Sequence, residues 1–285
     1  MISVFGPGFI GGRFCELYPE DTIEITRDEY IPKSNEVLYL ISTTDNYNVF
    51  TNPCLDIETN LIILMKVLQN CNQDTIFNYV SSWFVYNNAP LPIKEDAYCN
   101  PKGLYAITKR AAEQLLISYC ETFKINYRIF RLGNVIGEGD KKASKKKNAL
   151  QYLMKEIIEG RDIDLYGGGT FTRDYMYVDD VCDAIHLCME KAPLNDIMHI
   201  ASGEPYKFVD LIEYTKFATS SQSKLNIVEP TDFHKIVQTK DNYLDISKLN
   251  ALGYKPKYDI YTALDKIIKH MQEEVNVALS GNPGV

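Results

Sequence analysis

The sequence predicts an α/β fold: a doubly wound parallel sheet of the Rossmann type, with a smaller α/β substrate-binding lobe towards the C-terminus. Short apolar runs alternate with segments of helical periodicity through the first half of the chain. These runs are continuously apolar, as in parallel strands that are buried on both faces. A glycine-rich turn, Gly6 to Gly11, directly follows the first run.

The composition is that of an ordinary globular protein. The 285 residues are 45% hydrophobic and 24% charged, enough for one large domain or a main domain with a lobe. The net charge of −8 argues against nucleic acid as a partner. The longest apolar run, Leu61–Leu68, is too short to span a bilayer. The chain opens on a strand without a signal peptide, and its seven cysteines lack metal-binding spacing, so we expect a cytoplasmic protein with no metal site and no membrane partner.

The first predicted strand, Ile2–Phe5, runs into the glycine turn, and a helix is expected over Gly11–Tyr18. The turn reads G-x-G-x-x-G between strand and helix, the context that dinucleotide binding requires. The first glycine permits the tight turn, the second lets the backbone approach a pyrophosphate, and the third allows close helix–strand packing. The candidate cofactor-binding residues here are Gly6, Gly8, Phe9, Ile10 and Gly11.

The end of the second predicted strand, Thr22–Thr26, bears on the choice of cofactor. An arginine and a threonine hydroxyl suit the 2′-phosphate of NADP, and Thr26 and Arg27 stand there. Asp28 could instead bind the ribose 2′-hydroxyl of NAD, and a solvated charged turn is a further alternative. We expect an NAD(P) cofactor, with NADP favoured over NAD.

The third strand is expected at Val37–Ser42, and Ser42 at its end is a further candidate for cofactor contact. Only some ten residues separate it from the second strand, so a full strand–helix–strand crossover does not fit there. Asp56–Asn70 predicts an amphipathic helix whose apolar stripe is either core or a dimer contact.

The fourth strand, Thr75–Val80, runs into Ser81 and Ser82. Ligands of open α/β sheets bind beyond the carboxyl ends of the strands, so Ser82 is a candidate for contact with a substrate oxygen. The alternative is that both serines only satisfy the strand end. A loop is expected over residues 87–103.

A helix is then expected from Tyr105 to about Phe123. Tyr105 and Lys109 lie one turn apart on the same face of this helix. A lysine ammonium beside a phenol would lower the phenol pKa and make Tyr105 usable as an acid or base. A chance spacing on a solvated helix is the alternative.

After the fifth predicted strand, Tyr127–Leu132, the pattern changes. Lys141–Lys147 contains five lysines, which predicts a solvated loop or else a lid that attracts an anionic substrate. Arg173 follows a glycine turn and suits a phosphate contact, or a surface ion pair with Asp174. Further helices are expected at Ala149–Glu159, Val178–Lys191, Phe208–Thr219 and Tyr261–Met271, and a strand at Met198–Ala201.

This organisation predicts two parts. Residues 1–137, with parts of 170–200, are assigned to a dinucleotide-binding domain. Residues 138–169 and 200–275 are assigned to the substrate-binding lobe. The tail 276–285 is expected to be frayed.

Taken in order, these stretches resemble the extended short-chain dehydrogenase/reductase superfamily, in its NAD(P)-dependent nucleotide-sugar epimerase/dehydratase/reductase branch. The resemblance covers nearly the whole chain, from Gly6 to about Leu264. The matching stretches are residues 6–11, 56–60, 80–86, 105–113, 131–137, 166–180 and 245–248.

The resemblance implies a catalytic set of Ser82, Tyr105 and Lys109. Tyr105 would exchange a proton with a sugar oxygen, Ser82 would hydrogen bond that oxygen, and Lys109 would lower the phenol pKa and hold the nicotinamide ribose. Asn134 and Arg173 match positions that contact the phosphates of a nucleotide sugar, and Trp83 is also placed at the substrate.

Departures from the family pattern narrow this expectation. Trp83 and Phe84 stand where 4,6-dehydratases often carry Asp-Glu, and neither can transfer protons, so dehydration is not expected. Asn87 replaces a common glycine, and Gln238 replaces a frequent arginine, which leaves the second phosphate contact open. Lys141–Lys147 has no family role that we can assign.

We therefore expect an oxidoreductase acting on a sugar hydroxyl or keto group, at C4. A 4-ketoreductase and a 4-epimerase both fit, and Arg27 with the compact chain favours the reductase. The alternative from another class is a non-catalytic dinucleotide sensor of the same fold. The resemblance also implies a homodimer formed through the helices at 56–70 and 107–123.

Overall fold

The computed structural model describes residues 1–44, 46–140, 143–144, 147–238 and 240–280. Its centre is a six-stranded sheet in the order β10-β5-β4-β3-β1-β2, in which every pairing is parallel. The doubly wound parallel sheet predicted from the sequence is confirmed. The strands are β1 Ile2–Phe5, β2 Thr22–Ile25, β3 Glu36–Tyr39, β4 Ile76–Ser82, β5 Asn126–Leu132 and β10 Asp196–Ile200.

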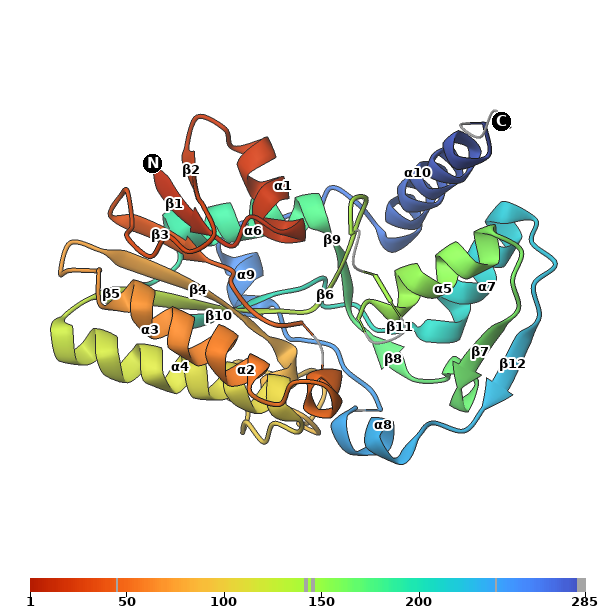
Figure 1. Ribbon diagram of the computed structural model, residues 1–285, viewed down its shortest axis with the longest axis horizontal. Helices are drawn as coiled ribbons and strands as arrows, with labels where there is room; N and C mark the ends of the chain where they lie inside the picture. Colours follow the sequence, from red (N-terminus) through yellow and green to blue (C-terminus); the bar gives the residue numbers. More distant parts are fainter. Residues whose placement is uncertain (45, 141–142, 145–146, 239, 281–285) are drawn as a thin grey trace.

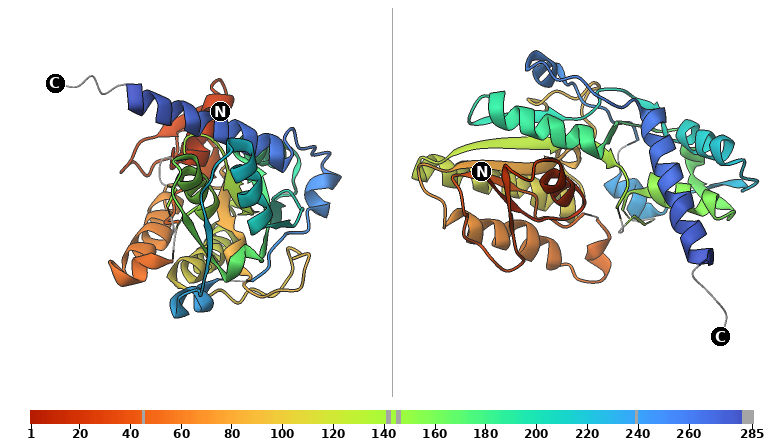
Figure 2. Two further views of the ribbon diagram at one scale, coloured as in Figure 1. Left: turned by 90° about the vertical axis from the view of Figure 1, so that its right-hand side faces the viewer. Right: turned by 90° about the horizontal axis from the view of Figure 1, so that it is seen from above.

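Helices cover both faces of this sheet (Figures 1 and 2). Val4 packs in one apolar cluster with residues of α1 and α6, whereas its neighbour Phe5 packs in another with residues of α3 and α4. Because successive strand side chains point to opposite faces, both must be apolar in a sheet covered on two sides. The helices are α1 Phe9–Leu17, α2 Leu55–Ile57, α3 Ile63–Leu68, α4 Leu104–Phe123 and α6 Val178–Lys191.

The chain reverses direction across the sheet at β1. β2 pairs with one side of β1 and β3 with the other. The connection between them, residues 26–35, contains no helix, as its length predicted. Crevices at such reversal points, outside the carboxyl ends of the strands, are where open α/β sheets bind ligands.

The helix predicted over Asp56–Asn70 is interrupted. Between α2 and α3 the backbone forms a π-turn at Glu58–Ile62, with one extra residue in the turn. The apolar stripe is still present, since Leu64 and Leu68 are buried against the sheet.

A second group of elements lies to the right of the sheet in Figure 1. Its strands are two to four residues long and pair in three small sheets, too short for the sequence to have predicted them. The pairs are β6 Asn134–Ile136 with β9 Tyr175–Tyr177, β7 Ile163–Tyr166 with β12 Leu225–Val228, and β8 Thr172–Arg173 with β11 Tyr206–Lys207. The helices are α5 Ala149–Ile158, α7 Phe208–Thr219, α8 Asp232–Val237 and α10 Ile260–Ser280. The short helix α9 Ser247–Ala251 instead packs against β10 of the central sheet.

The C-terminal helix corrects one expectation. We expected the helix to end at Met271 and the tail to fray from residue 276, but α10 continues to Ser280. Residues 272–280 contain neither glycine nor proline, and Gly281 is the first helix-breaking residue after Met271. Residues 281–285 lie outside the described residues. Within the described part of the chain, no helix is long and apolar enough to cross a membrane.

Candidate active site

The glycine turn after β1 has the geometry that its sequence predicted. Gly6 has φ of 86°, and a Cβ there would lie 2.9 Å from the backbone nitrogen of Ile41. A Cβ on Gly11 would lie 2.4 Å from the carbonyl oxygen of Gly6. Both positions therefore require glycine, the first for its dihedral angle and the second for the close packing of α1 on the turn.

Gly8 differs from both, because a Cβ there would have no atom within 4 Å. Gly8 is also the N-cap of α1, and no side chain caps this helix. An anion at this place would meet bare backbone and the positive end of the helix dipole. The turn therefore fits the diphosphate of NAD(P). Phe9 and Ile10, in the first turn of α1, pack partly buried against the core.

At the end of β2, Arg27 differs from its neighbours in its contacts. The Thr26 hydroxyl donates to Glu29 Oε2 at 3.2 Å, and Lys33 pairs with the same carboxylate at 3.1 Å. Arg27 is exposed and has no hydrogen bond or ion pair to any residue that the structure describes. Its side chain is thus open to a ligand, whereas the hydroxyl of Thr26 is already engaged.

Ser82 and Tyr105 meet at the carboxyl end of β4. Ser82 is the last residue of β4, and its hydroxyl accepts a hydrogen bond from the Phe84 amide at 3.3 Å. Tyr105 lies in the first turn of α4, after Gly103 with φ of 83°. The Ser82 hydroxyl lies beside the Tyr105 phenol and lowers the phenol pKa. Lys109 follows one turn later on the same helix face.

Lys109 is buried, with 2% of its surface exposed. Its ammonium donates to the carbonyl oxygen of Val80 at 2.6 Å and lies 4.4 Å from the centre of the Tyr79 ring. Burial lowers the pKa of Lys109 to about 7, and the negative charge of Glu113 opposes that fall. A lysine poised near neutrality is uncommon outside functional sites.

The expected effect of Lys109 on Tyr105 is wrong for this structure. Burial raises the pKa of the Tyr105 phenol, the neighbouring Ser82 hydroxyl lowers it in part, and the charge of Asp56 raises it further. The ammonium of Lys109 donates to the Val80 carbonyl oxygen and lies over the Tyr79 ring. The phenol is therefore protonated near neutral pH.

Aromatic side chains connect this pair to Arg173. Trp83 stacks on Phe84 with ring centres 4.1 Å apart, and the edge of Phe84 meets Tyr105 at 5.8 Å. The guanidinium of Arg173 lies 5.6 Å from the Trp83 ring and 4.5 Å from the Phe171 ring. The structure thus brings two predicted substrate residues, Trp83 and Arg173, onto the same side as Tyr105.

Arg173 is largely buried, and burial lowers its pKa. Its guanidinium donates to the carbonyl oxygens of Thr172 and Lys240, each at 2.7 Å. The alternative of a surface ion pair with Asp174 does not hold. Asp174 is fully buried, and its carboxylate accepts hydrogen bonds from the backbone amides of Ser202, Gly203 and Leu244.

Asn134 lies at the start of β6, where it has a structural partner. Its side-chain amide donates to the carbonyl oxygen of Asp174 at 2.9 Å, alongside the backbone bond to the same oxygen. The part of Lys141–Lys147 that is described includes Lys147, whose ammonium lies 3.1 Å from Asp140. Lys141, Lys142, Lys145 and Lys146 lie outside the described residues.

Asn60 was not among the predicted site residues, but it lies at the centre of a polar cluster. Its carbonyl oxygen accepts from the Ser42 hydroxyl at 3.0 Å and from the Thr43 amide at 2.9 Å. Its amide donates to the hydroxyls of Thr43 and Thr108, each at 2.9 Å. Asn60 lies in the π-turn and links the segment after β3 to α4, the helix of Tyr105. Its occurrence in a matching stretch, residues 56–60, was the available signal.

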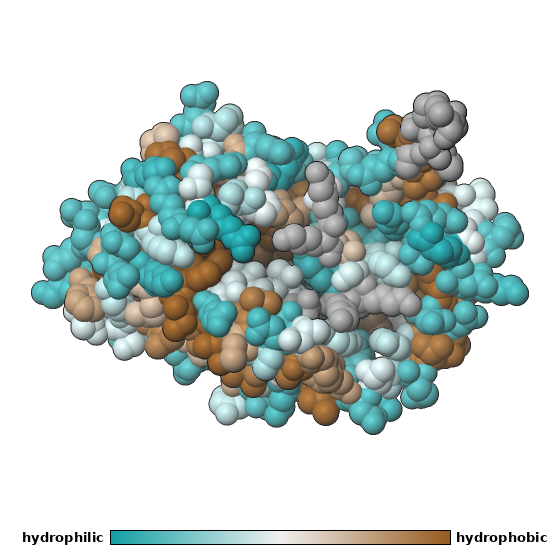
Figure 3. Space-filling view, viewed as in Figure 1, coloured by the Kyte–Doolittle hydropathy of each residue, from teal (hydrophilic) through white to brown (hydrophobic). Residues whose placement is uncertain are grey.

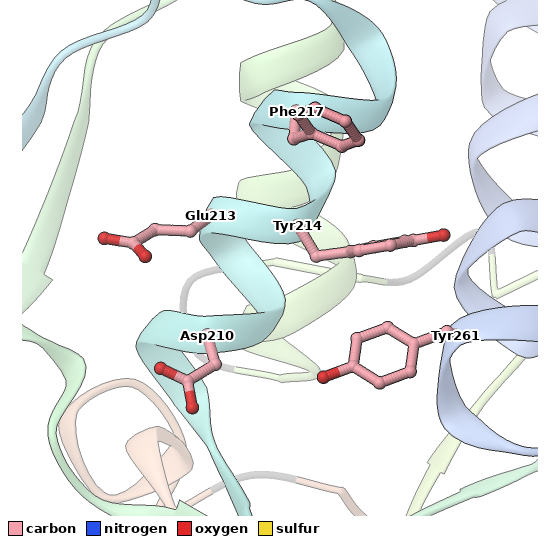
Figure 4. A pocket seen from close by; sticks show the side chains of 5 residues that line it. All are labelled: Asp210, Glu213, Tyr214, Phe217 and Tyr261. Carbon is pink, nitrogen blue, oxygen red and sulfur yellow. The ribbon is translucent and has the colours of Figure 1, made fainter.

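A shallow depression lies elsewhere, between α7 and α10, and includes none of the predicted site residues. In Figure 4 the rings of Tyr214 and Tyr261 lie side by side, and the two acidic side chains point away from them. It is lined by Asp210, Glu213, Tyr214, Phe217 and Tyr261.

Comparison with known proteins gives one family. The model of the NAD dependent epimerase/dehydratase family matches residues 22–201. The chain is 25% identical over 231 residues to a putative UDP-glucose 4-epimerase of Methanocaldococcus jannaschii, covering 79% of this chain and 73% of that protein. It is also 25% identical over 278 residues to the GDP-6-deoxy-D-mannose reductase of Pseudomonas aeruginosa, covering 94% and 85%.

Solved structures show the same fold. The UDP-glucose 4-epimerase of Thermotoga maritima, solved with UDP-glucose, superposes with a TM-score of 0.85 at 22% identity, covering 96% of this chain and 99% of that one. RMD from Pseudomonas aeruginosa, complexed with NADPH, superposes with a TM-score of 0.82 at 20% identity, covering 95% and 99%.

Proposed function

Because the chain belongs to the NAD dependent epimerase/dehydratase family, we propose that it is an NAD(P)-dependent oxidoreductase of nucleotide sugars that acts at C4. Among its relatives are 4-epimerases and reductases of such sugars. We favour a 4-ketoreductase over a 4-epimerase. The observation that carries the proposal is the Ser82 hydroxyl beside the Tyr105 phenol, with Lys109 one turn behind Tyr105 on α4.

In this proposal the Tyr105 phenol exchanges a proton with the sugar oxygen at C4, and the Ser82 hydroxyl orients that oxygen. NAD(P), when bound, supplies or accepts the hydride. The cofactor's diphosphate would lie on the backbone at Gly8, and Lys109 would hold the nicotinamide ribose. A phenol whose pKa is raised by burial is protonated near neutral pH and suits proton donation to a keto group, which supports the reductase.

Arg27 supports NADPH as the cofactor. Its guanidinium is exposed at the end of β2 and suits a 2′-phosphate, whereas the neighbouring Thr26 hydroxyl is bound to Glu29. On the substrate side, Arg173 and Asn134 are proposed to contact the phosphates of the nucleotide sugar. Both would exchange their present carbonyl partners for phosphate oxygens.

Trp83 and Phe84 argue against a 4,6-dehydratase, because no carboxylate stands at those two places next to Tyr105. The non-catalytic sensor has no support from the comparisons. The seven cysteines are all free, four of them buried, which supports a reducing compartment such as the cytoplasm.

One assay separates the reductase from the epimerase. The purified protein is incubated with 4-keto nucleotide sugars and with 4-hydroxy nucleotide sugars, with and without added NADPH. Consumption of one NADPH per 4-keto sugar reduced is the expected result. Interconversion of 4-hydroxy epimers without net consumption would show an epimerase. Binding of dinucleotide without turnover of any sugar in the panel would contradict both.

A further inference from the structure

Behind the catalytic pair lies a buried carboxylate that the proposed chemistry does not yet use. Glu113 stands on α4 one turn after Lys109, and none of its surface is exposed. It accepts hydrogen bonds from Ser81 Oγ at 2.6 Å, from Arg131 Nε and Nη2 at 2.9 and 2.7 Å, and from Arg110 Nη1 at 2.7 Å. These donors come from β4, β5 and α4 itself.

This carboxylate is kept ionised in the core. Burial alone would raise the pKa of Glu113, but the bonds and charge of Arg131, with the bonds from Ser81 and Arg110, hold it below its usual value. Packing apolar residues in place of a buried ion pair is often no less stable. The retained charge therefore calls for a reason beyond stability of the fold.

The neighbours of Lys109 supply that reason. Its ammonium faces the Tyr79 ring and the Val80 carbonyl oxygen of β4, and the phenol of Tyr105 precedes it by one turn. Glu113 is the one charged group among the described residues that acts on it, and it stabilises the ammonium. Arg110 and Arg131 are positively charged, and both form ion pairs with Glu113. Asp56 acts on Tyr105 rather than on Lys109.

Glu113 also reaches the strand that carries Ser82. The Ser81 hydroxyl, which bonds Glu113, belongs to the residue directly before Ser82 in β4. The same carboxylate therefore fixes the distance between the helix of Tyr105 and Lys109 and the strand of Ser82.

We propose that Glu113 is a positioning residue that keeps Lys109 in its charged form and holds the helix of Tyr105 against the strand of Ser82. The inference rests on the proposed function for its chemical purpose, since a charged Lys109 is what would hold the nicotinamide ribose. Its electrostatic part concerns the free protein and can be tested without substrate.

The test measures the titration of Lys109 directly. The protein is labelled with ¹³C at the ε carbon of lysine, the signal of Lys109 is assigned by its loss in Lys109→Arg, and its midpoint is followed by NMR against pH. In Glu113→Gln the opposing charge is gone, so the midpoint falls below that of the wild type by roughly one pH unit or more. Glu121→Gln, an exposed change two turns further along α4, is the matched control and leaves the midpoint in place.

A second pair of variants guards against a folding failure of Glu113→Gln, which circular dichroism would detect. Arg110→Gln removes a partly exposed cation that pairs with Glu113, so the midpoint of Lys109 stays or rises. Glu113→Asp keeps the charge and holds the midpoint closer to the wild-type value than Glu113→Gln does. If Glu113 had only a structural role, the Lys109 midpoint would not follow the charge in these two variants.

A measurement of turnover tests the positioning part of the proposal. Glu113→Asp shortens the side chain, so kcat is expected to fall about tenfold or more while the Lys109 midpoint is largely kept. An unchanged Lys109 midpoint in folded Glu113→Gln, or a lowered one in Arg110→Gln, overturns the inference. Absence of turnover in the wild type would overturn the proposed function instead. The NMR titration of Lys109 needs no substrate, so its result would remain valid.

Discussion

At Tyr105 two influences compete for one proton. Burial holds the phenol protonated, and the Ser82 hydroxyl pulls its pKa back only in part. A protonated phenol donates a proton to a developing alkoxide without first having to gain one, which suits the reduction of a ketone. The direction of the reaction is thus tied to the solvation of a single side chain.

Replacing Tyr105 by phenylalanine removes the proton donor and leaves the ring. We expect turnover to fall by roughly a hundredfold or more, the usual scale for loss of an acid–base group. NADPH binding and thermal stability should change little, because the aromatic ring that packs against Phe84 is kept. Turnover within a few fold of the wild type would remove Tyr105 from the mechanism.

Arg27→Ala tests the cofactor at the end of β2. The guanidinium has no hydrogen bond or ion pair to the residues that the structure describes, so its removal should leave stability unchanged. Loss of a charged contact to a 2′-phosphate should weaken NADPH about tenfold or more while leaving NADH unaffected. Isothermal titration with both cofactors measures the ratio, and equal losses would contradict a 2′-phosphate contact.

Local patterns predicted the placement of Ser82, Tyr105 and Lys109, because strand ends and helix spacing fix it. The charge states escaped prediction, since burial depends on packing from distant segments. Arg173 shows the same limit. Its environment is made by Trp83, Phe171 and the carbonyl oxygen of Lys240, and no spacing rule joins these positions.

At the scale of elements, the three glycines of the turn have different roles: Gly6 and Gly11 serve the packing of the fold, whereas Gly8 is proposed to serve cofactor binding. Gly11→Ala places a Cβ 2.4 Å from the Gly6 carbonyl oxygen and should destabilise the protein by about 1–3 kcal/mol. Gly8→Ala meets open space and should leave the melting temperature nearly unchanged, yet weaken NADPH binding. Thermal unfolding and cofactor titration of the two variants give this contrast. Equal stability of both variants would show that the turn is not closely packed.

The elements that sequence periodicity found are the long ones. The π-turn at Glu58–Ile62 could not be predicted, because an amphipathic stripe reads alike with or without one extra residue. The paired strands of the lobe are too short for periodicity to detect, and partners such as β7 and β12 lie some sixty residues apart. The continuation of α10 to Ser280 was available from the absence of a helix breaker.

For the whole molecule, one buried network links β4, β5 and β10 to the loop at Asp245. The His199 ring bonds the Tyr86 hydroxyl at 2.7 Å and the carbonyl oxygen of Asp245 at 2.8 Å, and it is fully buried. Burial lowers the pKa of His199 to about 4. The imidazole of His199 is therefore neutral in the folded protein near neutral pH.

This residue makes stability depend on pH with a definite sign. Between about pH 6.5 and 4 the unfolded chain binds a proton on His199 that the folded chain does not, so stability is lost as the pH falls through that window. The loss reaches about 3 kcal/mol at most. Urea unfolding of the wild type and of His199→Gln, compared across this range, isolates it. Parallel pH profiles for the two proteins would contradict the neutral buried ring.

The homodimer is a second prediction at this scale. Apolar side chains gather over the helices α2 to α4 on the face shown in Figure 3, and three of them, Ile62, Ile107 and Leu115, are 49%, 47% and 40% exposed. We expect these helices to pair with those of a second copy. Leu115→Glu should halve the mass measured by light scattering, and Phe217→Glu, at an 81% exposed position on α7, should not. A monomeric wild type would contradict the prediction.

The helix-free passage from β2 to β3 has a consequence for cofactor traffic. Residues 26–35 contain no helix and are exposed or half-buried throughout, so the adenosine end of a dinucleotide bound beside them would be open to water. A nicotinamide nucleotide held this way behaves as a travelling cosubstrate that leaves after each cycle rather than as a resident prosthetic group. Such exchange would couple the rate of sugar reduction to the ratio of reduced to oxidised nucleotide around the enzyme. Protein that retained a full complement of nucleotide through extended dialysis would refute this.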